Sequence, residues 1–298
     1  MLTAEYFRPF DATYDEVTHL MLEEAVRLPP PESDWLLCLI VEFYRERMKW
    51  NSDSRFASYQ RAWSKLDSKF MRLAAAAYLH ISYDLPRVLA DQQPSIAPWI
   101  NLSRAQAFYL FFKLDPIFPT VFSRIAKDRK IVGYVAYFVR PISSRLLRSV
   151  SHWVPLLRRA AWTHGQELAA RSDRRFVETK MLEAVTLALE DTSNLPWSAG
   201  LLTPPDGAFA PALGMPVISM SDIDRFWIGV ASLATILTIV GSGATRFAKK
   251  GYETGRFIDE LGRRTFDYVS AAVTDPEGFD NYRQRQLSGN TAAERGRA

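Results

Sequence analysis

The sequence predicts an all-α fold, a multi-helix globular bundle with one long irregular loop. Apolar residues recur at spacings of three and four almost throughout, and the alternation typical of strands is nearly absent. Hydrophobic residues make up 48% of the chain and aromatic residues 13%, which is enough for a packed core and argues against a disordered chain. A chain of 298 residues suits one large helical domain.

Two helices are expected near the N-terminus. Thr13 and Glu16 have the spacing of a capping box, so we expect the first helix to begin near Thr13. The prolines at 29–31 end it. The helix that follows is apolar on all sides over 35–41, which predicts a central position in the bundle.

The middle of the chain is predicted to be a succession of helices. A helical stretch covers 54–83 with a break near Asp67, and the alanines at 74–77 would let another helix approach closely. Two further helices are expected within 104–127, and two or three arginine-rich helices within 131–191.

The C-terminal third contains the long loop, at 193–220, with five prolines and three glycines. A loop of this length is typical of a lid or binding loop, although a linker to a C-terminal helix pair fits equally well. The apolar helix at 226–241 has sixteen residues, fewer than the roughly twenty that span a bilayer, so a buried helix is favoured over membrane contact. An amphipathic helix is expected at 252–273, within a single domain of residues 1–282, and a disordered tail at 283–298.

The net charge and the cysteine content indicate which class of partner and which cellular compartment to expect. The net charge is +4 and the pI is about 9.1, so the chain is mildly basic. Nucleic-acid-binding proteins usually concentrate more positive charge than this, so no nucleic-acid partner is expected. Cys38 is the one cysteine and cannot form an internal disulfide, and its apolar neighbours predict an inert, buried thiol. The first residues lack the pattern of a signal peptide, so a cytoplasmic location is predicted.

The strongest functional signal is the pair His80 and Asp84, which follows the alanine-rich segment and precedes Pro86. Residues four apart share a helix face, so both side chains can reach one point. Imidazole and carboxylate groups serve as zinc or iron ligands and also as an acid/base pair. An alternative is that Asp84 caps a helix that begins at Leu85 and His80 is a core histidine.

The segment His80-Ile81-x-x-Asp84-Leu85-Pro86 resembles the signature His-Ile-Asn-His-Asp-Leu-Pro of the domain-of-unknown-function 5995 family. Members of that family are helical, mostly bacterial proteins without an assigned chemistry. The resemblance implies that His80 and Asp84 are functional. The sequence departs from the signature at Ser82, where the family has asparagine, and at Tyr83, where it has a second histidine.

A metal site is a second interpretation of the same residues. His164 and Glu167 are three apart and share a helix face, so a bundle that joins them to His80 and Asp84 would offer two nitrogens and two carboxylates. Zinc or iron is the divalent metal that such a set would hold, and Glu42 is a further candidate ligand. The alternative is a solvated His164/Glu167 pair, because the paired Glu-x-x-His repeats of diiron proteins are absent.

These features predict a small-molecule enzyme that acts on a largely hydrophobic substrate in a pocket between helices, in a role such as secondary metabolism. His80 and Asp84 act as acid/base pair or metal ligands, and Tyr83 and Tyr78 are candidate proton donors. Hydrolase, lyase or cyclase, and metal-dependent oxygenase chemistry all remain open. The alternative is a non-catalytic helical module that binds an apolar ligand, a partner helix or a membrane surface.

Overall fold

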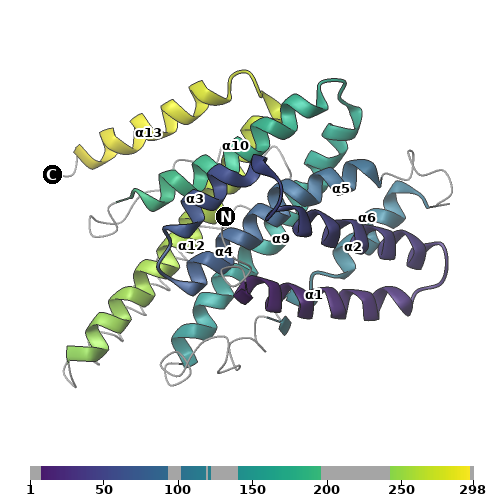
Figure 1. The fold of residues 1–298 in the computed structure, drawn as a ribbon, viewed down its shortest axis with the longest axis horizontal. Coiled ribbons are helices and arrows are strands. Elements are labelled where there is room, and N and C mark those ends of the chain that lie inside the picture. Colours follow the sequence, from purple (N-terminus) through teal and green to yellow (C-terminus); the bar gives the residue numbers. More distant parts are fainter. Residues whose placement is uncertain (1–7, 93–101, 119, 122–139, 196–241, 296–298) are drawn as a thin grey trace.

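Helices make up most of the computed structural model, in which residues 8–92, 102–118, 120–121, 140–195 and 242–295 are described (Figure 1). These ranges contain no strand, so the all-α prediction is confirmed for them. Nearly all of the predicted loop at 193–220, and the apolar segment 226–241, lie outside the described residues. No described helix is both long and apolar enough to cross a bilayer.

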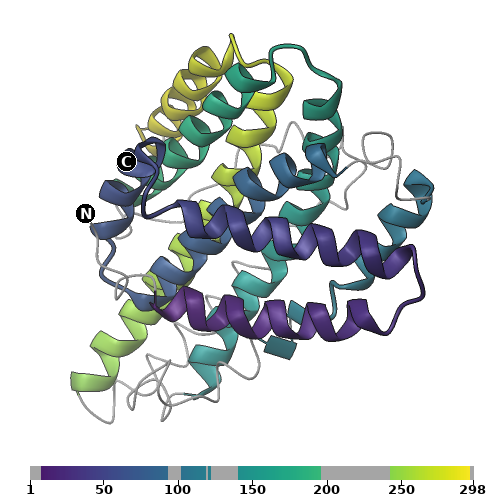
Figure 2. The same ribbon diagram turned by 45° about the vertical axis from the view of Figure 1, so that its right-hand side comes forward.

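The chain begins with a hairpin of two helices, α1 (Arg8–Val26) and α2 (Glu32–Lys49), which lie side by side in Figures 1 and 2. Thr13 is buried within α1, so the prediction that the helix begins there is wrong. The reason is that Phe10, one turn earlier, continues the buried face of the helix towards the N-terminus.

Helix α2 is buried on one face only. Leu36 and Ile40 are buried, whereas Val41 is 42% exposed and Cys38 is half-buried. The expected burial on all sides is therefore wrong, because α1 and the central helices cover one side of α2 and leave the other open. Partial burial raises the pKa of the Cys38 thiol, which disfavours the reactive thiolate.

The predicted break near Asp67 is confirmed. A short 3-10 turn η2 (Ser54–Phe56) leads into α3 (Ala57–Ser64), and α4 (Lys69–Leu79) begins after four non-helical residues. The alanines of α4 are almost completely buried, and α4 packs against α1, α9 and α12. Their small side chains thus permit the close approach that the sequence predicted.

The helix does not stop before Pro86. A π turn η3 (His80–Asp84) joins α4 directly to α5 (Leu85–Asp91), and the Leu85 N–H donates to the His80 carbonyl five residues earlier. Proline has no N–H to donate and its ring normally clashes with the preceding turn, so a locally widened turn accommodates it. Every residue of the π turn is buried.

Five further helices follow along the described chain. They are α6 (Arg104–Lys113), α9 (Arg140–Ala170), α10 (Arg174–Ser193), α12 (Ser242–Thr274) and α13 (Phe279–Arg295). Helices α9, α10 and α12 pack on one another, and α5 lies along α9. The π turn contacts α2, α9, α10 and α12, so it lies between the N-terminal hairpin and the group formed by α9, α10 and α12.

Helix α13 occupies most of the segment for which the sequence predicts a disordered tail, so that prediction is wrong up to Arg295. The helix is anchored at its start, where Phe279 is fully buried. Tyr282 packs edge-on against Tyr268, and Arg283 forms a bidentate ion pair with Asp191. These anchors lie in a mostly polar segment, which is why composition alone suggests disorder.

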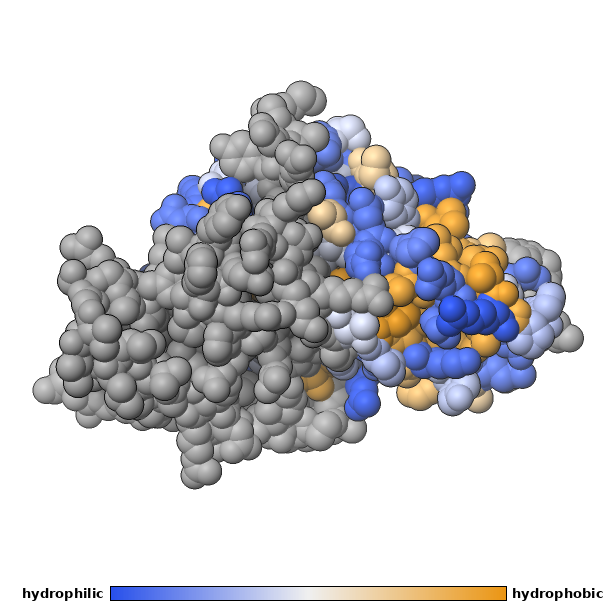
Figure 3. All heavy atoms as spheres, turned by 90° about the horizontal axis from the view of Figure 1, so that it is seen from below, coloured by the Kyte–Doolittle hydropathy of each residue, from blue (hydrophilic) through white to orange (hydrophobic). Residues whose placement is uncertain are grey.

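Hydrophobic side chains are also exposed on one side of the molecule. The face in Figure 3 shows a hydrophobic area on the side where α1, α2 and α6 lie in Figure 1. The large exposed apolar residues on these helices are Val26, Val41, Tyr44, Met48, Phe108 and Tyr109. Exposed apolar residues of this number are common on monomeric proteins and assign no partner.

Gly165 sets the distance between α9 and α5. A Cβ atom at this position would lie 2.8 Å from Leu89 Cβ and 2.9 Å from the Pro86 carbonyl oxygen. Gly165→Ala is therefore expected to lower the free energy of unfolding by about 1–2 kcal/mol, because overpacking outweighs the better helix propensity of alanine. Chemical denaturation of this variant and of the half-buried Thr163→Ala control measures the difference; a Gly165→Ala protein more stable than wild type would contradict the close packing.

Candidate functional site

The predicted pair His80 and Asp84 is in direct contact inside the bundle. His80 Nδ1 lies 2.7 Å from Asp84 Oδ2, and the indole Nε1–H of Trp50 donates to the same oxygen at 2.8 Å. The exposed fraction is 2% for His80 and 0% for Asp84. The spacing of four residues thus brings the two groups together as predicted, although through a π turn.

The contacts of this pair define its protonation. Because an ionised carboxylate only accepts hydrogen bonds, we assign the proton of the imidazole to Nδ1, which leaves a lone pair on Nε2. Burial lowers the pKa of His80 below its usual value, and this effect outweighs the neighbouring Asp84, which raises it. Among the described residues, His80 Nε2 has no hydrogen-bond partner. The geometry therefore presents a neutral, oriented imidazole with a free basic nitrogen.

Aromatic rings hold the imidazole in place. Phe43 of α2 stacks on His80 with a centroid distance of 3.6 Å, and Tyr14 of α1 meets the ring edge-on at 4.6 Å. Trp50 and Phe10 lie edge-on at 5.6 Å and 6.1 Å. This apolar surrounding explains the lowered pKa, because it solvates an imidazolium poorly.

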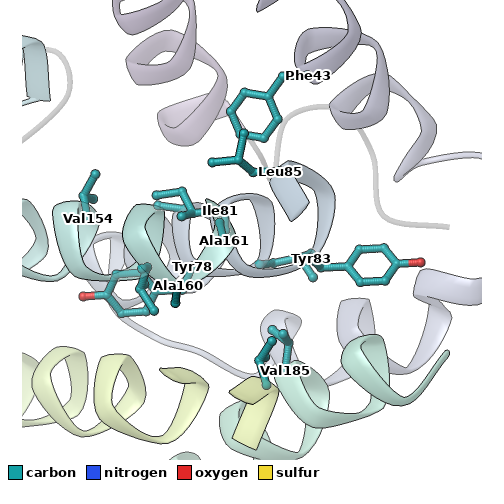
Figure 4. Close-up of a cluster of buried hydrophobic side chains, with 14 of the residues drawn as sticks. Phe43, Tyr78, Ile81, Tyr83, Leu85, Val154, Ala160, Ala161 and Val185 are labelled. Carbon is teal, nitrogen blue, oxygen red and sulfur yellow. The ribbon is translucent and has the colours of Figure 1, made fainter. Parts of the chain in front are cut away.

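A cavity of about 40 Å³ adjoins His80. Its walls are mainly apolar side chains of α1, α4, α9 and the π turn; Figure 4 shows the lining residues Phe43, Ile81 and Leu85. Arg158 also lines the cavity; its Nε donates to Asp115 Oδ1 at 2.8 Å, and its guanidinium lies over the Phe111 ring. The cavity has room for about two or three water-sized groups.

Tyr83 does not join this cavity. Its ring extends from the π turn towards the opposite side from Tyr78, as Figure 4 shows, and Arg87 lies over it at 4.9 Å. Tyr83 lines a separate polar groove of about 770 Å³ along α10. Burial raises the pKa of Tyr83 to about 12. The structure therefore separates Tyr83 from His80, with which it was predicted to act.

The four predicted metal ligands do not form one site. Among the described residues, no group of three or more His, Cys, Asp or Glu side chains could hold a metal ion. His164 is buried in α9, where its Nε2 lies 3.3 Å from Ser270 Oγ of α12, so a solvated His164/Glu167 pair is also wrong. Glu167 is half-buried, and Glu42 forms an ion pair with Arg45.

The burial of His164 predicts acid sensitivity. Burial lowers its pKa from 6.5 to about 4, so the folded state keeps it neutral while the unfolded state takes up a proton below pH 6.5. Stability is lost as pH falls from 6.5 towards 4, by about 3 kcal/mol. The free energy of unfolding, measured by chemical denaturation at pH 7, 5.5 and 4.5, should decrease less with falling pH for His164→Gln than for wild type. An equal decrease in the two proteins would contradict this assignment.

Two residues of the site, Trp50 and Phe43, have no signal in the sequence, and a third, Arg87, has a weak one. Phe43 lies in α2 and Trp50 directly follows that helix, thirty or more positions before the pair, and only the tertiary fold brings them to it. Arg87 Nη1 lies 3.9 Å from Asp84 Oδ1 and bonds to Glu46 Oε2 at 2.8 Å. The three-residue spacing between Asp84 and Arg87 is the one clue that sequence reasoning could have used.

Comparison of the chain with protein-family models, with curated proteins and with solved structures finds no match. The resemblance of residues 80–86 to the family signature thus stays a local one. The geometry of the site is the basis for any assignment of function.

Proposed function

We propose that the protein is an enzyme that acts on a small, largely hydrophobic molecule by acid–base chemistry, with His80 as the general base and Asp84 as its orienting partner. The observation that supports this proposal is the free, buried Nε2 of His80 beside a cavity, with Nδ1 held by Asp84. A neutral imidazole fixed by a carboxylate is the arrangement that abstracts a proton from water or a substrate.

The chain supplies the parts that such a step needs. Nε2 accepts the proton, and the Asp84 carboxylate stabilises the imidazolium that forms. The aromatic residues around His80 exclude bulk water, which strengthens this electrostatic effect. In hydrolysis Nε2 would take a proton from the water that attacks the substrate, and in elimination it would take a proton from a substrate carbon as the neighbouring leaving group departs; the proton can then pass from the imidazolium to the leaving group. We therefore favour hydrolase or lyase chemistry over a metal-dependent oxygenase.

The cavity limits the substrate. At about 40 Å³ it accepts only a small group, so a larger molecule reaches His80 only if wall residues move. Helix α1 contributes Phe10, Tyr14 and Met21 to the wall. Because α1 lies at the edge of the bundle in Figure 2, we expect a displacement of α1 to admit the substrate.

Non-catalytic binding of a small apolar molecule in the same cavity is the second candidate. The observation that favours it is the wall itself, which is mainly apolar, with Leu73, Leu85 and Val154 among its residues. In this case the His80–Asp84 hydrogen bond has a structural role and stabilises the buried π turn. An apolar ligand would then be recovered chemically unchanged from the protein.

Incubation of the purified protein with an extract of small molecules, followed by mass spectrometry, separates the two candidates. An enzyme consumes at least one apolar compound, and His80→Gln loses this activity. His164→Gln is the control, since among the residues of described burial His164 is the second buried histidine and it has no carboxylate partner there. An apolar compound that binds wild type and is released unaltered would favour the binding module.

A further inference from the structure

The polar groove of about 770 Å³ is a second site that the proposed acid–base chemistry does not use. One wall is a single face of α10, and the other comes from η2, α3, the π turn and α5. Its volume lies in the range of sites for small molecules. Tyr83 and Arg87 contribute to the wall opposite α10.

Charged residues of both signs line this groove. Arg175 stands at the start of α10 and is exposed, and Arg87 lies near it, 3.3 Å from Glu178. Glu183 lies at the middle of α10, and Glu190 lies near its C-terminal end. The lining contains three arginines and three glutamates, so the groove is neutral as a whole, with Arg175 and Glu190 at opposite ends of the face of α10.

Two of these charges form no close side-chain contact of their own within the described residues, although Arg283 interacts with Glu190 at longer range. Within the described residues, neither Arg175 nor Glu190 takes part in a side-chain hydrogen bond or ion pair, whereas Glu178 pairs with Arg174 and Glu183 pairs with Lys180. Arg175 and Glu190 are fifteen positions apart, which is about 22 Å along a helix axis. Their side chains can lean inwards and shorten this distance.

The stretch between these charges suits an extended chain. Leu182 and Leu187 provide apolar surface, and Thr179, Thr186 and Ser58 provide hydroxyl oxygens. The Thr179 and Thr186 hydroxyls donate to carbonyls of their own helix, so their oxygens remain acceptors for an N–H of a ligand. An extended peptide advances about 3.3 Å per residue, so about four to six residues would bridge the two charges.

We propose that this groove binds a short linear peptide with free termini, its carboxylate at Arg175 and its ammonium group at Glu190. The net neutrality of the lining disfavours a polyanion such as a nucleic acid, and the separated charges favour a zwitterion of matching length. The site uses neither His80 nor its cavity, so it stands independently of the proposed enzyme activity.

Titration calorimetry with penta-alanine tests this assignment. Free penta-alanine should bind at least about tenfold more tightly than the same peptide acetylated at its N-terminus and amidated at its C-terminus. Arg175→Ala and Glu190→Ala should each weaken binding of the free peptide about threefold to tenfold. Glu23→Ala on α1 and Arg27→Ala, directly after that helix, are the controls; neither residue lines the groove, and neither change should have an effect.

Singly blocked peptides sharpen the test. Arg175→Ala should not weaken binding of the C-terminally amidated peptide, and Glu190→Ala should not weaken binding of the N-acetylated one. In each case the blocked terminus no longer carries the charge with which the substituted residue would pair. His80→Gln should bind penta-alanine like wild type. Equal binding of free and doubly blocked peptides, or no binding up to about 10 mM, would overturn the proposal.

Discussion

His80→Gln is expected to lower the turnover rate of the substrate found in the extract by about a factor of 10² to 10⁴. Glutamine has no basic nitrogen, so the proton can no longer be taken up at the position of Nε2. The variant should fold, with a loss of about 1–2 kcal/mol from the lost stacking on Phe43. Steady-state kinetics and circular dichroism measure the two effects separately.

The control and the pH profile make this result specific. His164→Gln should keep the wild-type rate at neutral pH, because His164 contacts Ser270 and does not line the cavity. Burial lowers the pKa of His80 below 6.5, so kcat/KM should be flat at neutral pH and fall only in acid, where the base becomes protonated. Wild-type turnover by His80→Gln would rule out His80 as the base.

Asp84→Ala is expected to lower the free energy of unfolding by about 3–5 kcal/mol. The carboxylate is fully buried and accepts from both Trp50 Nε1 and His80 Nδ1. Its removal takes away the acceptor shared by two buried donors and opens a small cavity, and each of these costs stability. Urea denaturation monitored by tryptophan fluorescence measures the loss.

Two further variants separate the buried hydrogen bonds from the charge. Asp84→Asn can place its carbonyl oxygen where Oδ2 lies and keep both donors satisfied, so it should lose only about 1–2 kcal/mol while lowering turnover. Asp91→Ala removes a mostly exposed carboxylate paired with Arg174, and it should cost less than about 1 kcal/mol. If Asp84→Ala proved no more harmful than Asp91→Ala, the hydrogen-bond account would be wrong.

The sequence reveals the helical class well because periodicity is a local property. The break near Asp67 and the burial of the alanines in α4 follow directly from this pattern. The continuation of the helix through Pro86 does not follow from this pattern, because proline favours the end of a helix and the sequence gives no sign of a π turn. The length of α13 is missed because Phe279 and a few ion pairs anchor an otherwise polar segment.

In the candidate site, too, the sequence predicts the local contacts but not those that depend on tertiary packing. The contact between His80 and Asp84 is local and follows from their spacing. The separation of Tyr83 from His80 depends on which neighbouring helix each side chain faces, and that is set by tertiary packing. For the same reason, the supposed meeting of His164 with His80 could not be judged from spacing within each helix.

The protonation state of His80 decides whether this residue can act as a base. Nitrogen-15 NMR of the imidazole groups across pH 4–8, with His80→Gln to assign the resonance, reports the tautomer and the pKa. We expect a neutral ring at pH 7 with the proton on Nδ1 and a pKa below 6.5. A ring protonated on Nε2, or doubly protonated at pH 7, would leave no lone pair on Nε2 and would contradict the role of His80 as a base.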